Sequence, residues 1–313
     1  MSASSAHVVA VGVFDGVHRG HQKILAVARA RARDLDTALA VITFEPHPDA
    51  VLGKAPPRPP LTPVGEKTAL LMEYGADRVD VLHFDREMAA LEPDAFVRRY
   101  LLDGLGMRFL VAGADFALGR ARRGDMGFLR DLGVRLGFGV EGISLFTEDG
   151  GSVSSTRIRS LLAEGRVQEA AELLGRPYCL EAQVVGGHGL GRELGFPTAN
   201  LEMLEHRCLP ADGIYAARVA LGDGAQRLGA LSIGTRPSVG GGPRTVEVYV
   251  LDFEGDLRGR SLRVEFLAWL REERHYPTLE ALARAIAEDV TQVRELAAQG
   301  RISAQFPARP PAS

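Results

Sequence analysis

The spacing of apolar segments changes near residue 175, and this change limits the chain to two kinds of domain in succession. Before it, short apolar runs alternate with helical patterns, and about 30 residues separate the first two runs, the size of a βαβ unit. Such alternation predicts a parallel sheet with helices on both faces and a ligand site at the carboxyl ends of its strands. The predicted strands are 8–13, 38–44, 79–82, 109–112 and 138–143, and the predicted helices are 21–35, 66–74 and 93–103.

Beyond residue 177 the apolar segments are alternating or β-branched and are separated by Gly, Asp and Pro turns, a pattern typical of an antiparallel barrel. A helix that begins at Leu279 repeats apolar residues with a period of about 3.6 and should pack on the barrel. We therefore expect domains at 1–177 and 178–300 and a disordered tail over 301–313. The predicted barrel strands are 182–185, 215–220, 228–233, 246–251 and 262–266, and two short helices, from 154–156 and over 167–174, precede them.

Composition excludes several classes of partner. The 313 residues are 46% hydrophobic and 25% charged, as in globular proteins with room for two cores. The formal charge of −3 gives no reason to expect nucleic acid, and no run of about 18 apolar residues could cross a membrane. The two cysteines lack a metal-binding spacing, and the first residues lack a secretory pattern. We expect small-molecule partners, no nucleic acid or membrane partner and a cytoplasmic location, with no expectation for the oligomeric state.

The segment from Val11 to His21 lies where the first predicted strand turns into the first predicted helix. Its glycines permit a tight turn and close approach of the backbone to a ligand. His18 and His21 lie about one helical turn apart and can donate to one anion at a helix N-terminus. The segment predicts a site for nucleotide phosphates, with a triphosphate as the expected ligand. The alternatives are a glycine-rich turn with two surface histidines and a zinc site, although no further metal-ligand motif accompanies the pair.

A second anion-binding motif is Ser154-Ser155-Thr156-Arg157-Ile158-Arg159, at the start of another predicted helix. Its hydroxyl and guanidinium groups suit a leaving pyrophosphate. The alternative is a simple helix N-cap.

The second half carries a glycine-rich segment, 186–192, that leads into Gly195-Phe196-Pro197-Thr198-Ala199-Asn200. In an extended chain Thr198 and Asn200 point to the same side, and their oxygens suit a hard cation such as Mg²⁺. The segment 245–251 places three valines on one face and Glu247 on the other, toward solvent or a cleft. A solvated surface glutamate is the simplest alternative.

Together these motifs resemble, over essentially the whole chain, the bacterial bifunctional riboflavin kinase/FAD synthetase family. The resemblance rests also on Thr43-Phe44-Glu45-Pro46-His47-Pro48 and on Gly113-x-Asp115-Phe116. It implies a Rossmann-like α/β nucleotidyltransferase domain that adenylylates FMN to FAD, followed by a β-barrel riboflavin kinase domain with a terminal helix. The implied substrates are riboflavin, FMN and ATP, with Mg²⁺ as cofactor.

The resemblance also implies roles for individual residues. His18 and His21 are the expected catalytic residues of adenylyl transfer and Glu247 is the expected base of the kinase, with Thr198 and Asn200 as metal ligands. In the adenylyltransferase site, ATP would be bound by Gly12, Phe14, Asp15, Gly16, Gly20, Ser155, Thr156, Arg157 and Arg159. The flavin of the same site would be bound by Phe44, Pro46, His47, Pro48 and Asp115. Kinase ATP would be bound by Gly187, Gly189, Gly191, Arg192 and Pro197, and kinase flavin by Arg271.

The chain departs from the family pattern at several positions. Ala117 and Leu118 stand where an Arg and an aromatic residue are usual, Ser238 where Thr is usual, and Arg258 where Tyr is usual. The departure at Ala117 and Leu118 motivates a first rival interpretation, an enzyme with only one of the two activities. A second rival is a non-catalytic flavin-binding protein.

Overall fold

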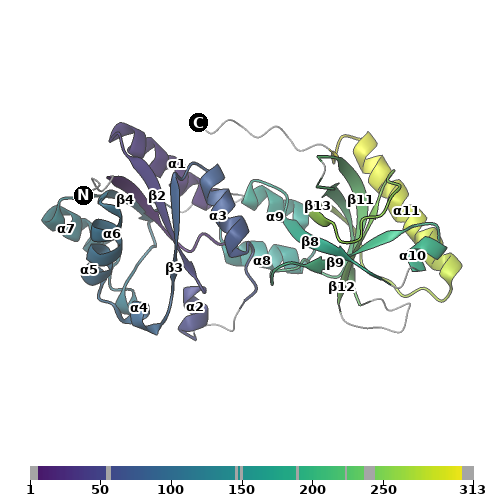
Figure 1. Ribbon diagram of the computed structural model, residues 1–313, viewed down its shortest axis with the longest axis horizontal. Coiled ribbons are helices and arrows are strands. Elements are labelled where there is room, and N and C mark those ends of the chain that lie inside the picture. Colours follow the sequence, from purple (N-terminus) through teal and green to yellow (C-terminus); the bar gives the residue numbers. More distant parts are fainter. Residues whose placement is uncertain are drawn as a thin grey trace. The chain divides into compact units, whose positions relative to one another are not determined.

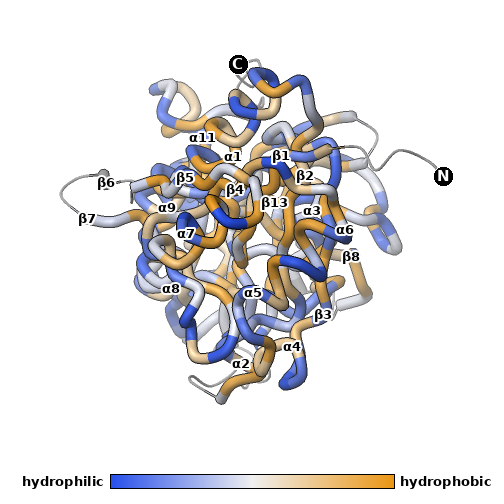
Figure 2. The backbone as a smooth tube through the Cα atoms, turned by 90° about the vertical axis from the view of Figure 1, so that its left-hand side faces the viewer, coloured by the Kyte–Doolittle hydropathy of each residue, from blue (hydrophilic) through white to orange (hydrophobic). Residues whose placement is uncertain are grey.

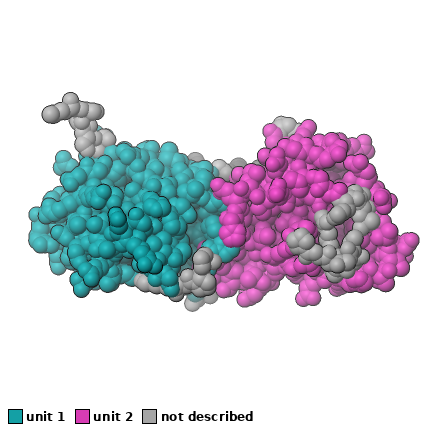
Figure 3. Space-filling view, turned by 60° about the horizontal axis from the view of Figure 1, so that its bottom comes forward, with its two compact units in different colours: residues 1–155, 310–313 teal, residues 156–309 magenta. Residues whose placement is uncertain are grey.

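The structure is a computed structural model that describes residues 6–53, 58–144, 147–148, 151–187, 190–222, 224–235 and 244–304. Contacts within the chain divide it into two compact units, and the division falls between Ser155 and Thr156. Among the described residues, we call those up to Ser155 unit 1 and those from Thr156 unit 2; Figure 3 colours the two units separately. No helix in the described ranges combines the length and the apolar character that a membrane crossing requires.

Unit 1 is built on a five-stranded parallel sheet, drawn in Figure 1. The strand order β3-β2-β1-β4-β5 reverses direction between β1 and β4, which makes their carboxyl ends the expected place for a ligand. All five strands lie where the sequence predicted them, with ends shifted by one or two residues. The strands are β1 His7–Val11, β2 Ala38–Glu45, β3 Arg78–His83, β4 Met107–Gly113 and β5 Gly139–Ile143.

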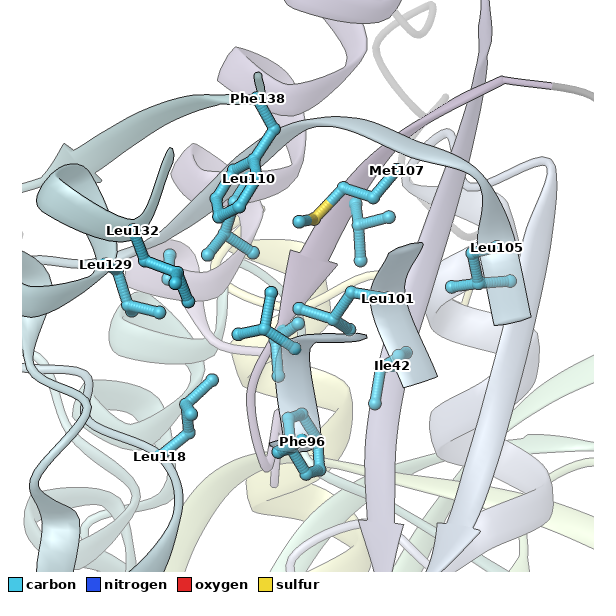
Figure 4. Close-up of a cluster of buried hydrophobic side chains, with 14 of the residues drawn as sticks. Ile42, Phe96, Leu101, Leu105, Met107, Leu110, Leu118, Leu129, Leu132 and Phe138 are labelled. Carbon is cyan, nitrogen blue, oxygen red and sulfur yellow. The ribbon is translucent and has the colours of Figure 1, made fainter. Parts of the chain in front are cut away.

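Helices cover both faces of this sheet because its strands alternate their side chains between two apolar clusters. On one face, Val8 and Ala10 of β1 pack with α1 and α3. On the other, Val9 and Val11 join the cluster in Figure 4, which includes Ile42 and side chains of α5 and α7. In Figure 2 the helices alternate between hydrophobic and hydrophilic stretches, as amphipathic helices do. The elements on the two faces are α1 Arg19–Asp34, α3 Val64–Glu73, α4 Arg86–Ala90, α5 Pro93–Phe96, the π-helical η1 Val97–Leu102, α6 Asp103–Leu105 and α7 Met126–Leu136.

Shorter elements complete unit 1. These are α2 Pro48–Val51, the 3-10 turn η2 Arg120–Arg122 and the two-stranded β6 Thr147–Glu148 and β7 Gly151–Ser152. The helix α8 Ser155–Ala163 begins at the last residue of the unit and continues into unit 2, followed by α9 Val167–Leu174. Both helices were predicted.

Unit 2 contains a closed antiparallel barrel of six strands in the order β10-β11-β12-β9-β8-β13. The barrel was predicted, but the sequence identified five of its strands and missed β9 as a barrel strand. The strands are β8 Cys179–Val185, β9 Thr198–Met203, β10 Gly213–Ala220, β11 Gln226–Gly234, β12 Thr245–Val250 and β13 Ser261–Arg271, and the helices of this part are α10 Leu190–Glu193 and α11 Leu279–Ala298.

The terminal helix α11 packs on the barrel as its periodicity predicted. Val293 and Leu296 are buried in a cluster with alanines of β10, β11 and β13. The chain stays packed beyond the helix: Ile302 belongs to this cluster, and the carbonyl of Ser303 accepts a hydrogen bond from Arg218 at 3.1 Å. The prediction of a disordered tail from residue 301 is therefore wrong for residues 301–304, while residues 305–313 lie outside the described residues.

The helices α8 and α9 are joined to the barrel at Trp269, the single tryptophan of the chain. The turn between them contains Gly165, at φ +74°, and a Cβ there would lie 2.5 Å from Cε3 of Trp269. On the barrel side Gly213 also abuts the indole ring, and Tyr215 meets it edge to face with ring centroids 5.0 Å apart. Close packing at this point therefore requires glycine.

We expect Gly165→Ala to lower the free energy of unfolding of unit 2 by about 2–4 kcal/mol. Backbone strain at positive φ accounts for about 1–2 kcal/mol, and overlap with the indole adds a similar amount. Unfolding in urea, followed by Trp269 fluorescence, measures the loss. Gly300→Ala is the matched control, because Gly300 has φ +68° but open space around its Cβ position. Equal losses in the two variants would contradict the packing argument.

Candidate functional sites

The histidine turn, residues 12–21, links β1 to α1 at the carboxyl edge of the sheet. His18 is the N-cap of α1, and its Nδ1 accepts a hydrogen bond from the backbone N–H of His21 at 3.4 Å. The two imidazole rings are stacked, with centroids 3.6 Å apart and planes 15° from parallel. Phe14 supports His21 from the side, with its ring edge to face at 5.2 Å. The predicted pair is therefore assembled at a helix N-terminus, where the backbone favours anions.

The backbone of this turn is strained. Phe14 and Val17 are non-glycine residues at φ 54° and 40°, and both side chains are buried. Such conformations cost about 1–3 kcal/mol each and persist only where the surroundings enforce them. Strain of this kind is characteristic of sites that hold a ligand.

Asp15 holds the histidine turn against the residues that precede α3. Its buried Oδ1 accepts hydrogen bonds from the N–H groups of Leu61 at 2.9 Å and Thr62 at 3.2 Å. The hydroxyl of Thr62 in turn accepts from Gly16 N–H at 3.0 Å, and the hydroxyl of Ser155 donates to the Asp15 carbonyl at 2.8 Å. Asp15 and Ser155 therefore shape the turn, and the end of the proline-rich stretch 55–63 is bound to it. The sequence did not identify Leu61 or Thr62, because they are distant in the chain from the turn.

The Phe-Glu-Pro-His-Pro segment leaves the sheet at the end of β2. Phe44 points into the hydrophobic core, where its ring meets those of Phe84 and Phe96 at 5.8 and 6.3 Å. After the cis peptide Glu45–Pro46, His47 is the N-cap of α2 and Nδ1 accepts from Asp49 N–H at 3.1 Å. The half-buried side chains at this exit are those of Pro46, His47 and Pro48.

The segment after β4 departs from the family pattern and is built into the core. Asp115 is exposed, whereas Leu118 is buried in the same cluster as Phe96 and pairs through its backbone with Gly124. The guanidinium of Arg122 donates to the Asp115 carbonyl at 2.8 Å. Leu118 thus has a packing role, and an arginine lies beside the segment although position 117 is alanine.

The second anion-binding motif spans the division between the units. Ser155 belongs to unit 1 with the histidine turn, whereas Thr156, Arg157 and Arg159 follow in the first turns of α8 in unit 2. Their role at a phosphate site stays a prediction.

Unit 2 holds a cavity of about 630 Å³ that brings Thr198, Asn200 and Glu247 together. Glu247 lies directly opposite Asn200 in the register of β12 and β9, and Thr198 is two residues away on the same face. The Thr198 hydroxyl donates to Oε2 of Glu247 at 3.1 Å. The three side chains are half-buried. The valines of β12, which alternate with Glu247 along the strand, are buried, as the sequence pattern predicted.

The glycine-rich segment borders this cavity. Gly187, Gly191, Arg192 and Pro197 line it. A Cβ on Gly187 would overlap the amide of Asn200, so the backbone can approach that side chain only as glycine. Gly189 lies outside the described residues, as does Ser238.

Arg271, the expected flavin contact of the kinase, lines the same cavity. Its guanidinium forms a two-pronged ion pair with Asp289 of α11, with both N–O distances 2.7 Å. Asp289 is 4% exposed, and burial raises the pKa of its carboxyl while the arginine opposes this shift. The pair attaches α11 to the end of β13 beside the cavity, and the sequence did not identify Asp289.

The oxygen donors in the cavity fit Mg²⁺, which prefers carboxylate, hydroxyl and amide oxygens. Within the described ranges, no group of three or more His, Cys, Asp and Glu side chains could hold a metal ion. Thr198 and Asn200 are the residues of this cavity that would hold such a cation.

The fold and the two candidate sites are those expected of a two-domain transferase that uses nucleotides: paired histidines lie at a helix N-terminus at the switch point of the parallel sheet, and Glu247 lines the barrel cavity. Family models match both parts: FAD synthetase over residues 1–157 and riboflavin kinase over residues 174–297. The chain belongs to the bifunctional riboflavin kinase/FMN adenylyltransferase family.

Relatives over nearly the whole chain carry that name. The protein from Pseudomonas fluorescens is 44% identical over 294 residues, covering 93% of each chain. The protein from Escherichia coli K12 is 39% identical over 291 residues, covering 92% of each. A solved structure from Streptococcus pneumoniae, titled a macrolide-efflux protein, is 29% identical with a TM-score of 0.85, covering 94% of this chain and 95% of that one.

Proposed function

We propose that this chain phosphorylates riboflavin to FMN in unit 2 and adenylylates FMN to FAD in the domain that carries the histidine turn. The observation that carries the proposal is the coexistence of two built sites: stacked His18 and His21 at a helix N-terminus, and Glu247 beside Thr198 in the barrel cavity. Family membership supplies the flavin substrates. The domain boundary near residue 177, the cytoplasmic location and the absence of nucleic acid and membrane partners remain predictions.

In adenylyl transfer an oxygen of the FMN phosphate attacks the α-phosphorus of ATP, and the bond to the β-phosphate oxygen breaks to release pyrophosphate. The chemistry needs positioning and charge stabilisation rather than a covalent nucleophile. We assign His18 and His21 to the phosphates, where imidazole donors can meet developing negative charge. Arg157 and Arg159 are assigned to the leaving pyrophosphate, and the exit of β2 to the flavin.

In the kinase step the oxygen of the ribityl 5′-hydroxyl attacks the γ-phosphorus of ATP, and ADP departs. Glu247 takes the proton of that hydroxyl as the attack proceeds. The Thr198 hydroxyl already lies against Oε2 of Glu247 and holds that carboxylate in the cavity. When bound by Thr198 and Asn200, Mg²⁺ would neutralise phosphate charge. We assign Gly187, Arg192 and Pro197 to the nucleotide because they line the same cavity.

Incubation of the purified protein with riboflavin, Mg²⁺ and ATP labelled at either the α- or the γ-phosphate tests this function. We expect γ-label in FMN and both labels in FAD. Accumulation of FMN without FAD would instead support the single-activity rival. Tight flavin binding without ATP turnover would support the non-catalytic one.

A further inference from the structure

Lys67 of α3 carries a buried ammonium group that the mechanism above does not use. The residue is 3% exposed, and its neighbours on the helix, Leu70 and Leu71, pack in the apolar core. Burying an ammonium group costs several kcal/mol unless partners compensate for the lost water. Burial lowers the pKa of Lys67, and the carboxylates of Glu45 and Asp15 oppose that shift.

Both close partners of the ammonium lie at the exit of β2. Nζ donates to the Phe44 carbonyl at 3.3 Å and lies 3.9 Å from Oε2 of Glu45. The next residues are Pro46 and His47, which lead into α2. The lysine therefore fixes the backbone at the point where the segment assigned to the flavin leaves the sheet.

The residues just before α3 are bound to the histidine turn. The residues that precede the helix, Leu61 and Thr62, donate to Asp15, and Thr62 accepts from Gly16. The N–H of Lys67 donates to the Pro63 carbonyl at 2.8 Å, so Lys67 lies about one helical turn beyond that attachment. The first turn of α3 and the residues before it therefore connect the histidine turn to the exit of β2.

We propose that Lys67 is a positioning residue of the adenylyltransferase, which holds the segment 44–47 in register with the histidine turn so that FMN meets ATP correctly. The inference rests on the proposed function. Lys67 is not assigned to the reacting atoms: it acts through the Phe44 carbonyl and Glu45.

The test compares Lys67→Met, which keeps the length but removes the donor and charge, with Lys67→Arg, which keeps both. We expect Lys67→Met to raise KM for FMN about tenfold or more while KM for ATP changes less than about threefold, since a hydrogen bond to a charged group is lost at the flavin side. Lys67→Arg should recover much of the loss. Riboflavin phosphorylation, measured in the same samples, should be unchanged.

Thr68→Ala is the matched control, because Thr68 lies next to Lys67 and its hydroxyl donates within its own helix, to the Val64 carbonyl. An unchanged KM for FMN in Lys67→Met would overturn the proposal, as would equal rises in both KM values with no recovery in Lys67→Arg.

If Lys67→Met fails to fold, Glu45→Gln provides a second test, because it removes the charge partner of Lys67 from the exposed side. It should also raise KM for FMN, and no change would overturn the proposal. Wild-type protein that makes no FAD would refute the proposed function itself, and the inference with it.

Discussion

Replacing His21 with alanine is expected to lower FAD synthesis from FMN and ATP by about 10²–10³-fold, because one preorganised donor to the phosphate charge is lost. The ring also stacks on His18 and contacts Phe14, so its removal loosens the turn as well. Riboflavin phosphorylation should stay at the wild-type rate. Rates of both half reactions, each started from its own flavin substrate, provide the measurement.

His206→Ala is a suitable control for this variant. His206 is exposed and belongs to unit 2, so it is part of neither the histidine turn nor the exit of β2. It should leave FAD synthesis within about twofold of wild type, as expected for a surface change outside the site. Normal FAD formation in His21→Ala would remove the histidine pair from the mechanism.

Replacing Glu247 with glutamine is expected to lower FMN formation by about 10²–10⁴-fold, the range typical of a lost general base. Glutamine keeps the size of the side chain and can still accept a hydrogen bond from Thr198, so the cavity should be preserved. FAD synthesis from supplied FMN should change little. The measurement is kcat for riboflavin phosphorylation in the variant and the wild type. The melting temperatures of both proteins show whether the fold is preserved.

Glu181→Gln provides the reference for a barrel carboxylate outside the cavity. Glu181 is exposed on β8 and forms an ion pair with Arg263 at 3.7 Å, a surface contact of small energetic value. We expect wild-type rates for both reactions. If Glu247→Gln behaved like this reference, Glu247 would be a solvated strand glutamate and the base would have to be sought elsewhere.

Much of the fold could be predicted because each element carries its own local pattern. The alternation of strands and helices located all five parallel strands, and turn residues separated five of the barrel strands. The strand β9 was missed because Asn200 and Glu202 dilute its β-propensity. The helix α7 was missed because two glycines weaken its helical pattern, and one of them, Gly133, is required where Phe138 approaches closely.

The candidate sites divide in the same way between local and distant features. His18 with His21, and Thr198 with Asn200, are close in sequence, so their spacing predicted a shared site. Partners far apart in the chain left no such signal: Asp15 is bound by Leu61 and Thr62, and Arg271 by Asp289. The flavin contact that the family resemblance implies for Arg271 stays a prediction, and the structure adds an ion pair with Asp289 that the sequence did not signal.

Mixing the two variants tests most directly whether one chain holds two separate active sites. Supplied with riboflavin and Mg-ATP, His21→Ala alone should accumulate FMN, and Glu247→Gln alone should leave riboflavin largely unconverted. The mixture should produce FAD, because FMN released by the first variant is a substrate for the second. If each variant retained its expected half reaction but their mixture formed no FAD, or if either substitution abolished both reactions, the two-site account would be contradicted.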